Sequence, residues 1–151
     1  MNCARLTFLV LLAFFLVSCG SGSPAKKIDG FWTASLQNPD GSVAYTFMAT
    51  LTQSTGSTVN VSSFGFSGPA PCFTAPLGQT ATFTASGHSG GYEIGSFGMS
   101  IATALMTMQE NVLTLNGIRN SDGRISGTWT LTGLSGCSGG GAYTMTAPIP
   151  L

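Results

Sequence analysis

The sequence predicts an all-β fold: a single antiparallel up-and-down meander of about eight strands that forms a closed or nearly closed β-barrel. Several segments alternate apolar and polar residues with the period of two expected of strands that have one face in the core. Turn sequences such as Pro39-Asp40-Gly41 and Asn120-Ser121-Asp122-Gly123 separate neighbouring segments. The chain is 7% charged and holds 21 glycines among many threonines, a composition typical of β domains. A two-sheet β-sandwich is the alternative architecture.

The strand segments follow from this alternation. We expect strands near 29–37, 43–53, 57–67, 79–86, 97–108, 111–118, 124–133 and 141–147. In the second segment the side chains expected to face inward are those of Val43, Tyr45, Phe47, Ala49 and Leu51. In the segment 79–86, Phe83 alternates with threonines in the same way. The alanines and methionines of 97–109 also fit one or two turns of helix, so both interpretations stay open there.

The first 19 residues predict export and lipidation. Arg5 precedes an apolar run of about 12 residues, too short to cross a bilayer but of the length of a signal-peptide core. The run ends in Leu16-Val17-Ser18-Cys19, which resembles the lipobox of bacterial lipoproteins: an aliphatic residue, a tolerant position, a small residue and cysteine. The resemblance implies that Cys19 becomes the first residue of the mature chain and carries a diacylglyceryl membrane anchor. An ordinary signal peptide cleaved elsewhere is the alternative.

This resemblance divides the chain into a signal peptide (1–18), a lipidated tether (19–27) and a β domain (28–151). The tether is rich in glycine and serine, and such a segment spans ~15 Å as a flexible coil. In enteric lipoproteins an aspartate after the cysteine retains the protein in the inner membrane. Gly20 stands at this position. The expected location is therefore the cell envelope, with the outer membrane favoured over the inner membrane and the domain in the periplasm.

The remaining cysteines predict a disulfide. Cys3 leaves with the signal peptide and Cys19 carries lipid, so Cys72 and Cys137 form an even pair in an exported domain. Both lie in turn-like sequence, so we expect the bond to join two connections between strands. Closing such a loop stabilises a fold by roughly 4 kcal/mol on the chain-entropy model. Two cysteines without a C-x-x-C spacing supply too few metal ligands, so no metal site is expected.

A Gly-x-Trp pattern occurs twice, as Gly30-Phe31-Trp32 and as Gly127-Thr128-Trp129. The first resembles the Gly-x-Trp that begins the barrel of lipocalins, and the second is similar to a segment of avidin-like barrels. The resemblance implies that such a tryptophan closes one end of a barrel. The candidates for closing an end or lining a ligand site are Trp32, Trp129, Tyr45, Phe47 and Phe83.

No catalytic motif is convincing. Gly87-His88-Ser89-Gly90-Gly91 matches the G-x-S-x-G pattern of α/β-hydrolases, but that chemistry needs a strand–turn–helix and a histidine after the serine. His88 is the single histidine of the chain. Arg119 and Arg124 flank one hairpin and are expected to be solvated. The net charge is zero, with no basic stripe for nucleic acid.

These observations predict a membrane-anchored, non-catalytic binding module without a cofactor. An eight-stranded barrel has room for side chains or for one small ligand, so a small apolar ligand is the expected partner. The alternative is a structural or protein-interaction role in the envelope, as an inhibitor or an accessory subunit.

Overall fold

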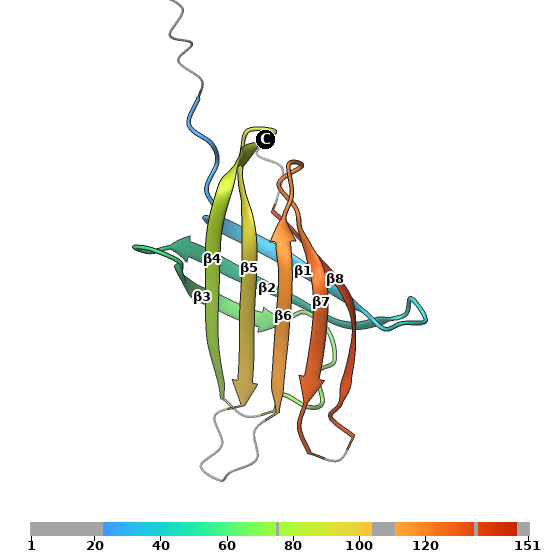
Figure 1. Ribbon diagram of the computed structural model, residues 1–151. Helices are drawn as coiled ribbons and strands as arrows, with labels where there is room; N and C mark the ends of the chain where they lie inside the picture. The colour runs from blue at the N-terminus through green and yellow to red at the C-terminus, as the bar shows by residue number, and fades with distance from the viewer. Residues whose placement is uncertain (1–22, 75, 104–110, 135, 148–151) are drawn as a thin grey trace, which may run out of the picture.

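Eight antiparallel strands in chain order form one closed barrel in the computed structural model of the chain (Figure 1). The strands are β1 (Gly30–Gln37), β2 (Val43–Gln53), β3 (Thr58–Phe66), β4 (Leu77–Ser89), β5 (Tyr92–Thr103), β6 (Val112–Arg119), β7 (Ile125–Thr132) and β8 (Gly139–Thr146). The structure describes residues 23–74, 76–103, 111–134 and 136–147. Each strand pairs with the next, and β8 pairs with β1. The predicted barrel meander is confirmed.

Strands β4 and β5 extend closer to each other along the chain than the sequence predicted, so the loop between them is shorter. The two strands pair up to Ser89 and Tyr92, which leaves Gly90 and Gly91 as the loop. Both glycines have positive φ, 59° and 82°, as the two central residues of a type I′ turn require. The strand predicted at 97–108 therefore starts at Tyr92 and is described as far as Thr103. Residues 104–109, where a helical turn was the alternative, lie outside the described residues.

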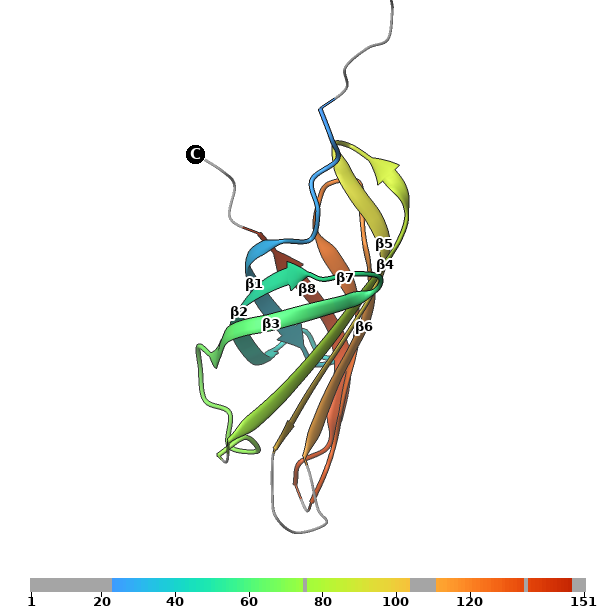
Figure 2. The ribbon, with the colours of Figure 1, turned by 90° about the vertical axis from the view of Figure 1, so that its left-hand side faces the viewer.

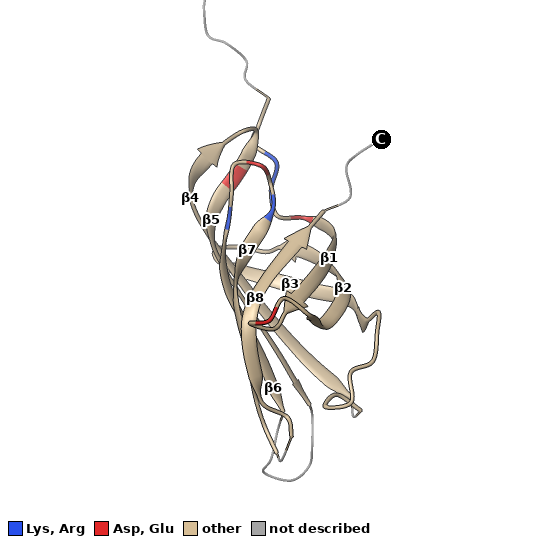
Figure 3. Cartoon of the chain, turned by 90° about the vertical axis from the view of Figure 1, so that its right-hand side faces the viewer, with Lys and Arg blue, Asp and Glu red and all other residues tan. Residues whose placement is uncertain are grey.

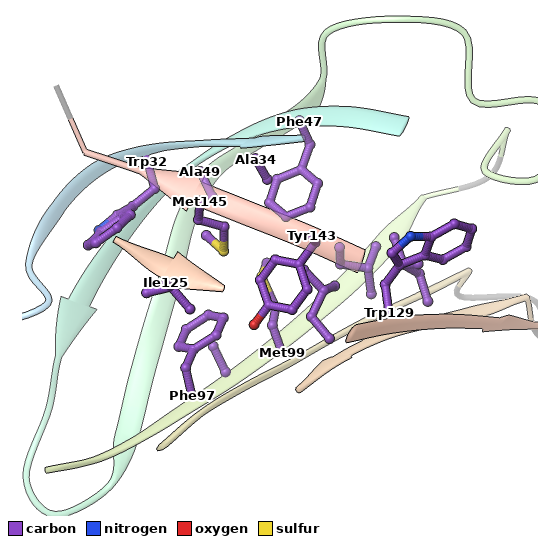
Figure 4. Close-up of a cluster of buried hydrophobic side chains, with 14 of the residues drawn as sticks. Trp32, Ala34, Phe47, Ala49, Phe97, Met99, Ile125, Trp129, Tyr143 and Met145 are labelled. Carbon is purple, nitrogen blue, oxygen red and sulfur yellow. The ribbon is translucent and has the colours of Figure 1, made fainter. Parts of the chain in front are cut away.

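The interior of the barrel is filled by side chains from all eight strands (Figure 4). Phe47 and Phe83 are fully buried, as their alternation with threonines predicted. The prediction that Val43 faces inward is wrong, because that side chain is 58% exposed. A bulge shifts the register between β1 and β2, so that Leu36 pairs with Tyr45 but Gln37 pairs with Val43. Val43 therefore points outward, as its partner Gln37 does.

A second bulge, in β3, places phenylalanines in the core. The pairing of β2 with β3 shifts between Met48 and Thr50. Ser63 has a φ of 52°, a left-handed conformation that is unusual for a residue other than glycine. One extra residue in a strand reverses the faces of the residues beyond it. Val61 on one side of the bulge and Phe64 on the other therefore both pack against the core.

The contact between β3 and β4 is the weakest in the barrel wall. These strands pair at two positions, Thr58 with Thr82 and Val59 with Ala81, and then diverge (Figure 2). The connection 67–76 joins their separated ends. A disulfide between Cys72 and Cys137 links this connection to the one between β7 and β8, with a Cα–Cα distance of 5.7 Å. The predicted disulfide and its placement between two connections are confirmed.

Tyr143 lies in the middle of the barrel, and its hydroxyl group occupies space that Gly117 leaves open. It pairs with Gly127 on β7, and Gly127 pairs with Gly117 on β6. A Cβ atom added to Gly117 would lie 2.4 Å from the Tyr143 hydroxyl oxygen. That hydroxyl is buried and has no hydrogen-bond partner among the described residues. Burial also raises the pKa of Tyr143, since the phenolate would lose its hydration.

Replacing Tyr143 with phenylalanine is expected to leave the free energy of unfolding unchanged or to raise it by about 1 kcal/mol, because an unpaired buried hydroxyl is removed. The effect on pH dependence has a definite sign. Tyrosine in an unfolded chain ionises near pH 10, and Tyr143 ionises at higher pH in the fold. The contribution of Tyr143 to the free energy of unfolding is therefore fully present below about pH 10 and decreases above it. Urea unfolding between pH 8 and pH 11 should show a shallower alkaline decline in Tyr143→Phe. If Tyr143→Phe were less stable than the wild type and lost stability just as steeply at alkaline pH, this account would be contradicted.

Candidate functional site

One end of the barrel is closed by Trp32 and Arg119. Trp32 is fully buried, and its indole Nε1–H donates to the carbonyl of Ile28 at 2.8 Å. The guanidinium of Arg119 lies 5.5 Å from the centre of the Trp32 ring, within the range of a cation–π contact. Its Nη1 donates to the carbonyl of Lys26 at 3.0 Å. Trp32 therefore lies near one end of the barrel, with the Arg119 guanidinium over its ring.

The prediction that Arg119 is solvated is wrong, because the residue is only 2% exposed. The sequence placed it correctly beside a hairpin, but its side chain turns inward over Trp32 and the ring of Tyr92. Burial lowers the pKa of Arg119, and the negative charge of nearby Glu93 opposes this shift. Arginine stays charged even when partly desolvated. Arg124, by contrast, is exposed as predicted.

The chain that leads into β1 is fastened over this closed end. The backbone N–H of Lys26 donates to the carbonyl of Gly91 at 2.9 Å, and the N–H of Glu93 donates to the carbonyl of Lys26 at 3.0 Å. The Lys26 carbonyl therefore accepts from both Glu93 and Arg119. These contacts hold the segment before β1 against the hairpin between β4 and β5 and against Arg119.

The opposite end of the barrel holds a cluster of aromatic side chains. Tyr45 contacts Trp129 edge-on with 5.9 Å between ring centres. Phe66 stacks on Phe73, which lies in the connection 67–76, at 5.0 Å. Phe64 joins the cluster through Phe66 at 5.3 Å. Tyr45, Phe64 and Phe66 are each only partly buried. Aromatic area that is left half-covered at the end of a barrel can take up the apolar surface of a ligand.

Trp129 reaches this end because glycines of β8 make room for it. Its Nε1–H donates to the carbonyl of Gln37 at 2.9 Å. A Cβ atom on Gly141 would lie 2.0 Å from that carbonyl oxygen, and one on Gly139 would lie 3.1 Å from the indole ring. The two Gly-x-Trp tryptophans therefore lie toward opposite ends of the barrel (Figure 4). The run of three glycines at 139–141 was the sequence signal for this contact.

A groove of about 310 Å³ opens beside this aromatic cluster. Its lining residues come from β2, β7, the first residue of β8 and three connections: Asn38, Val43, Ala44, Tyr45, Pro69, Pro71, Trp129, Leu131, Ser138 and Gly139. None of these side chains is charged. The volume is at the lower limit of sites for small molecules. The groove therefore suits a small, uncharged group that has both apolar and hydrogen-bonding surface.

The structure separates the predicted site residues into three places. Tyr45 and Trp129 lie together at the groove, whereas Phe47 and Phe83 are buried in the core and Trp32 closes the far end. Cys19 lies outside the described residues. Sequence reasoning missed the aromatic residues of the bulged β3 and of the connection 67–76. The spacing Val59-x-Val61-x-x-Phe64-x-Phe66, with one extra residue in the alternation, was the signal for the first of these.

The hydrolase-like motif has the wrong geometry for a nucleophile elbow. His88 and Ser89 are consecutive residues of β4, so their side chains point to opposite faces of the sheet. Both are exposed. A hairpin follows them, where the elbow would need a helix. Among the described residues no three His, Cys, Asp or Glu side chains are grouped to hold a metal ion.

Comparison with protein-family models, with curated proteins and with solved structures finds no match to this chain. Within the part of the chain that the structure describes, no helix has the length and apolar character needed to cross a membrane. The candidate site is therefore inferred from the geometry of the structure alone.

Replacing Arg119 with methionine is expected to lower the free energy of unfolding by about 2–3 kcal/mol, because buried carbonyls lose a charged donor and Trp32 loses its cation–π contact. Arg124→Met is the matched control, since its ion-pair contact with Asp122 is 3.8 Å long and both side chains are more than half exposed. Such a pair contributes at most about 1 kcal/mol. Urea denaturation measures both changes. Equal effects of the two substitutions would show that Arg119 does not hold the closed end.

Proposed function

We propose that this protein is an envelope lipoprotein whose β-barrel is a non-catalytic binding module for a small, uncharged and largely apolar ligand. The groove beside Tyr45 and Trp129 is the proposed site. The observation that carries the proposal is the partly buried ring of Tyr45 on the lining of an uncharged groove. The other end is sealed by Trp32 and Arg119.

The lining of the groove argues for the chemical class of ligand. Val43, Tyr45 and Pro71 offer apolar surface, while Asn38 and Ser138 offer hydrogen-bonding groups at its rim. Polar groups placed among apolar side chains are the usual means of orienting a small ligand. A charged ligand would find no partner of opposite sign among these residues. A neutral molecule with one or two polar groups fits this lining best.

A protein partner is the second candidate, and the filled interior favours it. Trp32, Phe47, Phe83, Trp129 and Leu131 are all at most 4% exposed, so the barrel holds a solid core. A partner would then bind at the surface, and the groove is one such place. Pro69 and Pro71 on its rim, beside the ring of Tyr45, would suit an extended peptide segment of an envelope protein. The role would then be that of an inhibitor or an accessory subunit.

Native mass spectrometry of the protein purified from its own cells tests the ligand. We expect a small molecule that remains bound and is lost on unfolding. Tyr45→Ala should raise the dissociation constant about tenfold and so lower the bound fraction, since an interaction of about 1.4 kcal/mol accounts for a factor of ten in affinity. Thr33→Ala, on the outer face of β1, is the control and should bind as the wild type does. Equal occupancy in both variants would remove the groove from the proposal, and a bound peptide would favour the second candidate.

The anchor is tested by Cys19→Ala. Without this cysteine no acyl chain can be attached at this position, and two or more chains are needed for stable attachment to a membrane. The protein should therefore move from the membrane fraction to the soluble fraction and lose the mass of the acyl chains. Intact-mass measurement and cell fractionation provide the readouts. A chain that stays in the membrane fraction, or whose wild-type mass lacks acyl groups, would refute lipidation at this position.

A further inference from the structure

The N-terminal segment enters the barrel at the closed end (Figure 1). Lys26 is held there by backbone hydrogen bonds with Gly91 and Glu93 and by the side chain of Arg119. A membrane anchor on the preceding residues would therefore be connected to the barrel at Lys26. Seven residues, from Cys19 to Ala25, separate the proposed anchor from Lys26.

The reach of this tether is short compared with the barrel. Seven residues from Cys19 to Ala25 extend to at most about 25 Å, and a flexible coil of that length averages about 15 Å. β4 has 13 residues, or about 40 Å of strand, which gives about 30 Å of barrel height at the usual strand tilt. A barrel turned over so that its far end met the bilayer would need more chain than the tether supplies.

Charged side chains gather near the closed end of the barrel (Figure 3). Lys26 and Glu93 lie there with Arg119, and the charge of Asp29 also acts on Arg119. Lys27 follows Lys26, Asp122 and Arg124 lie on the hairpin after Arg119, and Asp40 lies on the hairpin between β1 and β2. Cations and anions are nearly balanced at the closed end, so an anionic membrane exerts little net attraction on it. The orientation of the barrel is therefore set by the attachment point and not by surface charge.

We infer that the closed end of the barrel faces the anchoring membrane and that the groove beside Tyr45 and Trp129 is held away from it. This inference rests on the proposed lipid anchor. Its consequence is that the groove receives its ligand from the aqueous compartment, as a dissolved or protein-carried neutral molecule, and does not extract lipid from the leaflet that holds the anchor.

The test measures the distance of two positions on β4 from a membrane. The mature chain, beginning at Cys19, is coupled through that thiol to a maleimide lipid in vesicles of phosphatidylethanolamine and phosphatidylglycerol. A fluorophore is attached through a genetically encoded azide residue at Ser89 or at Thr80, which leaves the Cys72–Cys137 disulfide intact. Both positions are exposed, and about 30 Å of strand separates them. Thr80 lies level with the groove, because it is joined through Ser100 and Thr114 to Thr130 in the strand register.

We expect energy transfer to a headgroup dye to be several-fold stronger from Ser89 than from Thr80, both in these vesicles and in vesicles of neutral lipid. Equal transfer, or stronger transfer from Thr80, would overturn the inference. Inserting about 40 glycine and serine residues after Gly22 lengthens the average tether to more than 30 Å and should reduce the difference. A difference that persisted with the long tether would show that tether length does not set the orientation.

This experiment is independent of lipidation in the cell, because the lipid is attached chemically. A wild-type protein that lacks acyl chains in cells would refute the proposed anchor while the vesicle measurement still reported the orientation. Conversely, a lipidated protein with Thr80 nearest the bilayer would keep the anchor and overturn the inference about the groove.

Discussion

The width of an eight-stranded barrel limits what this chain can hold inside. Such a barrel has room for one layer of side chains across its interior, so each large residue needs a small one opposite it. The Tyr143 hydroxyl uses the space over Gly117. Trp129 uses the space over Gly139 and Gly141 in the same way. These glycines of β6 and β8 are therefore part of the packing of the core, which the side chains of the described residues fill.

Because the interior is filled, the two ends of the barrel determine what it can do. At one end a buried cation, two aromatic rings and backbone carbonyls form a compact polar seal around Arg119. At the other end, half-covered aromatic rings surround a shallow uncharged groove. An end with many hydrogen bonds is suited to carry a tether, and a groove with apolar surface is suited to recognition. The two ends of the same strands therefore have different roles.

The sequence was sufficient for the fold because its alternation and its turns agree with each other. The faces of Phe47, Phe83 and Leu131 follow from a period of two, and the hairpins follow from glycine-containing turns. The errors arise where a single residue breaks the period. A bulge turned Val43 outward, and another brought Phe64 inward. Sequence alternation carries no information about where the register between two strands shifts.

The candidate site was predictable only in part. Tyr45 and Trp129 were named from sequence, but their meeting at one groove depends on how β2, β7 and the connection 67–76 converge. Arg119 was misjudged because a charged residue beside a hairpin is usually solvated. Its burial depends on Trp32, which lies far away in the sequence, and on a carbonyl of Lys26. Such long-range compensation of a buried charge has no local signature.

The sparse pairing between β3 and β4 makes this seam the place where the barrel should breathe. The backbone amides of β3 beyond Val59 that point toward β4 lack ladder partners, whereas those that point toward β2 are paired, so the hydrogens on the β4 side should exchange with solvent through small local openings. The Cys72–Cys137 bond limits how far such an opening extends, because it joins the chain beside the seam to the connection between β7 and β8. Movement at the seam would shift the connection 67–76 and so change the width of the groove that Pro69 and Pro71 line.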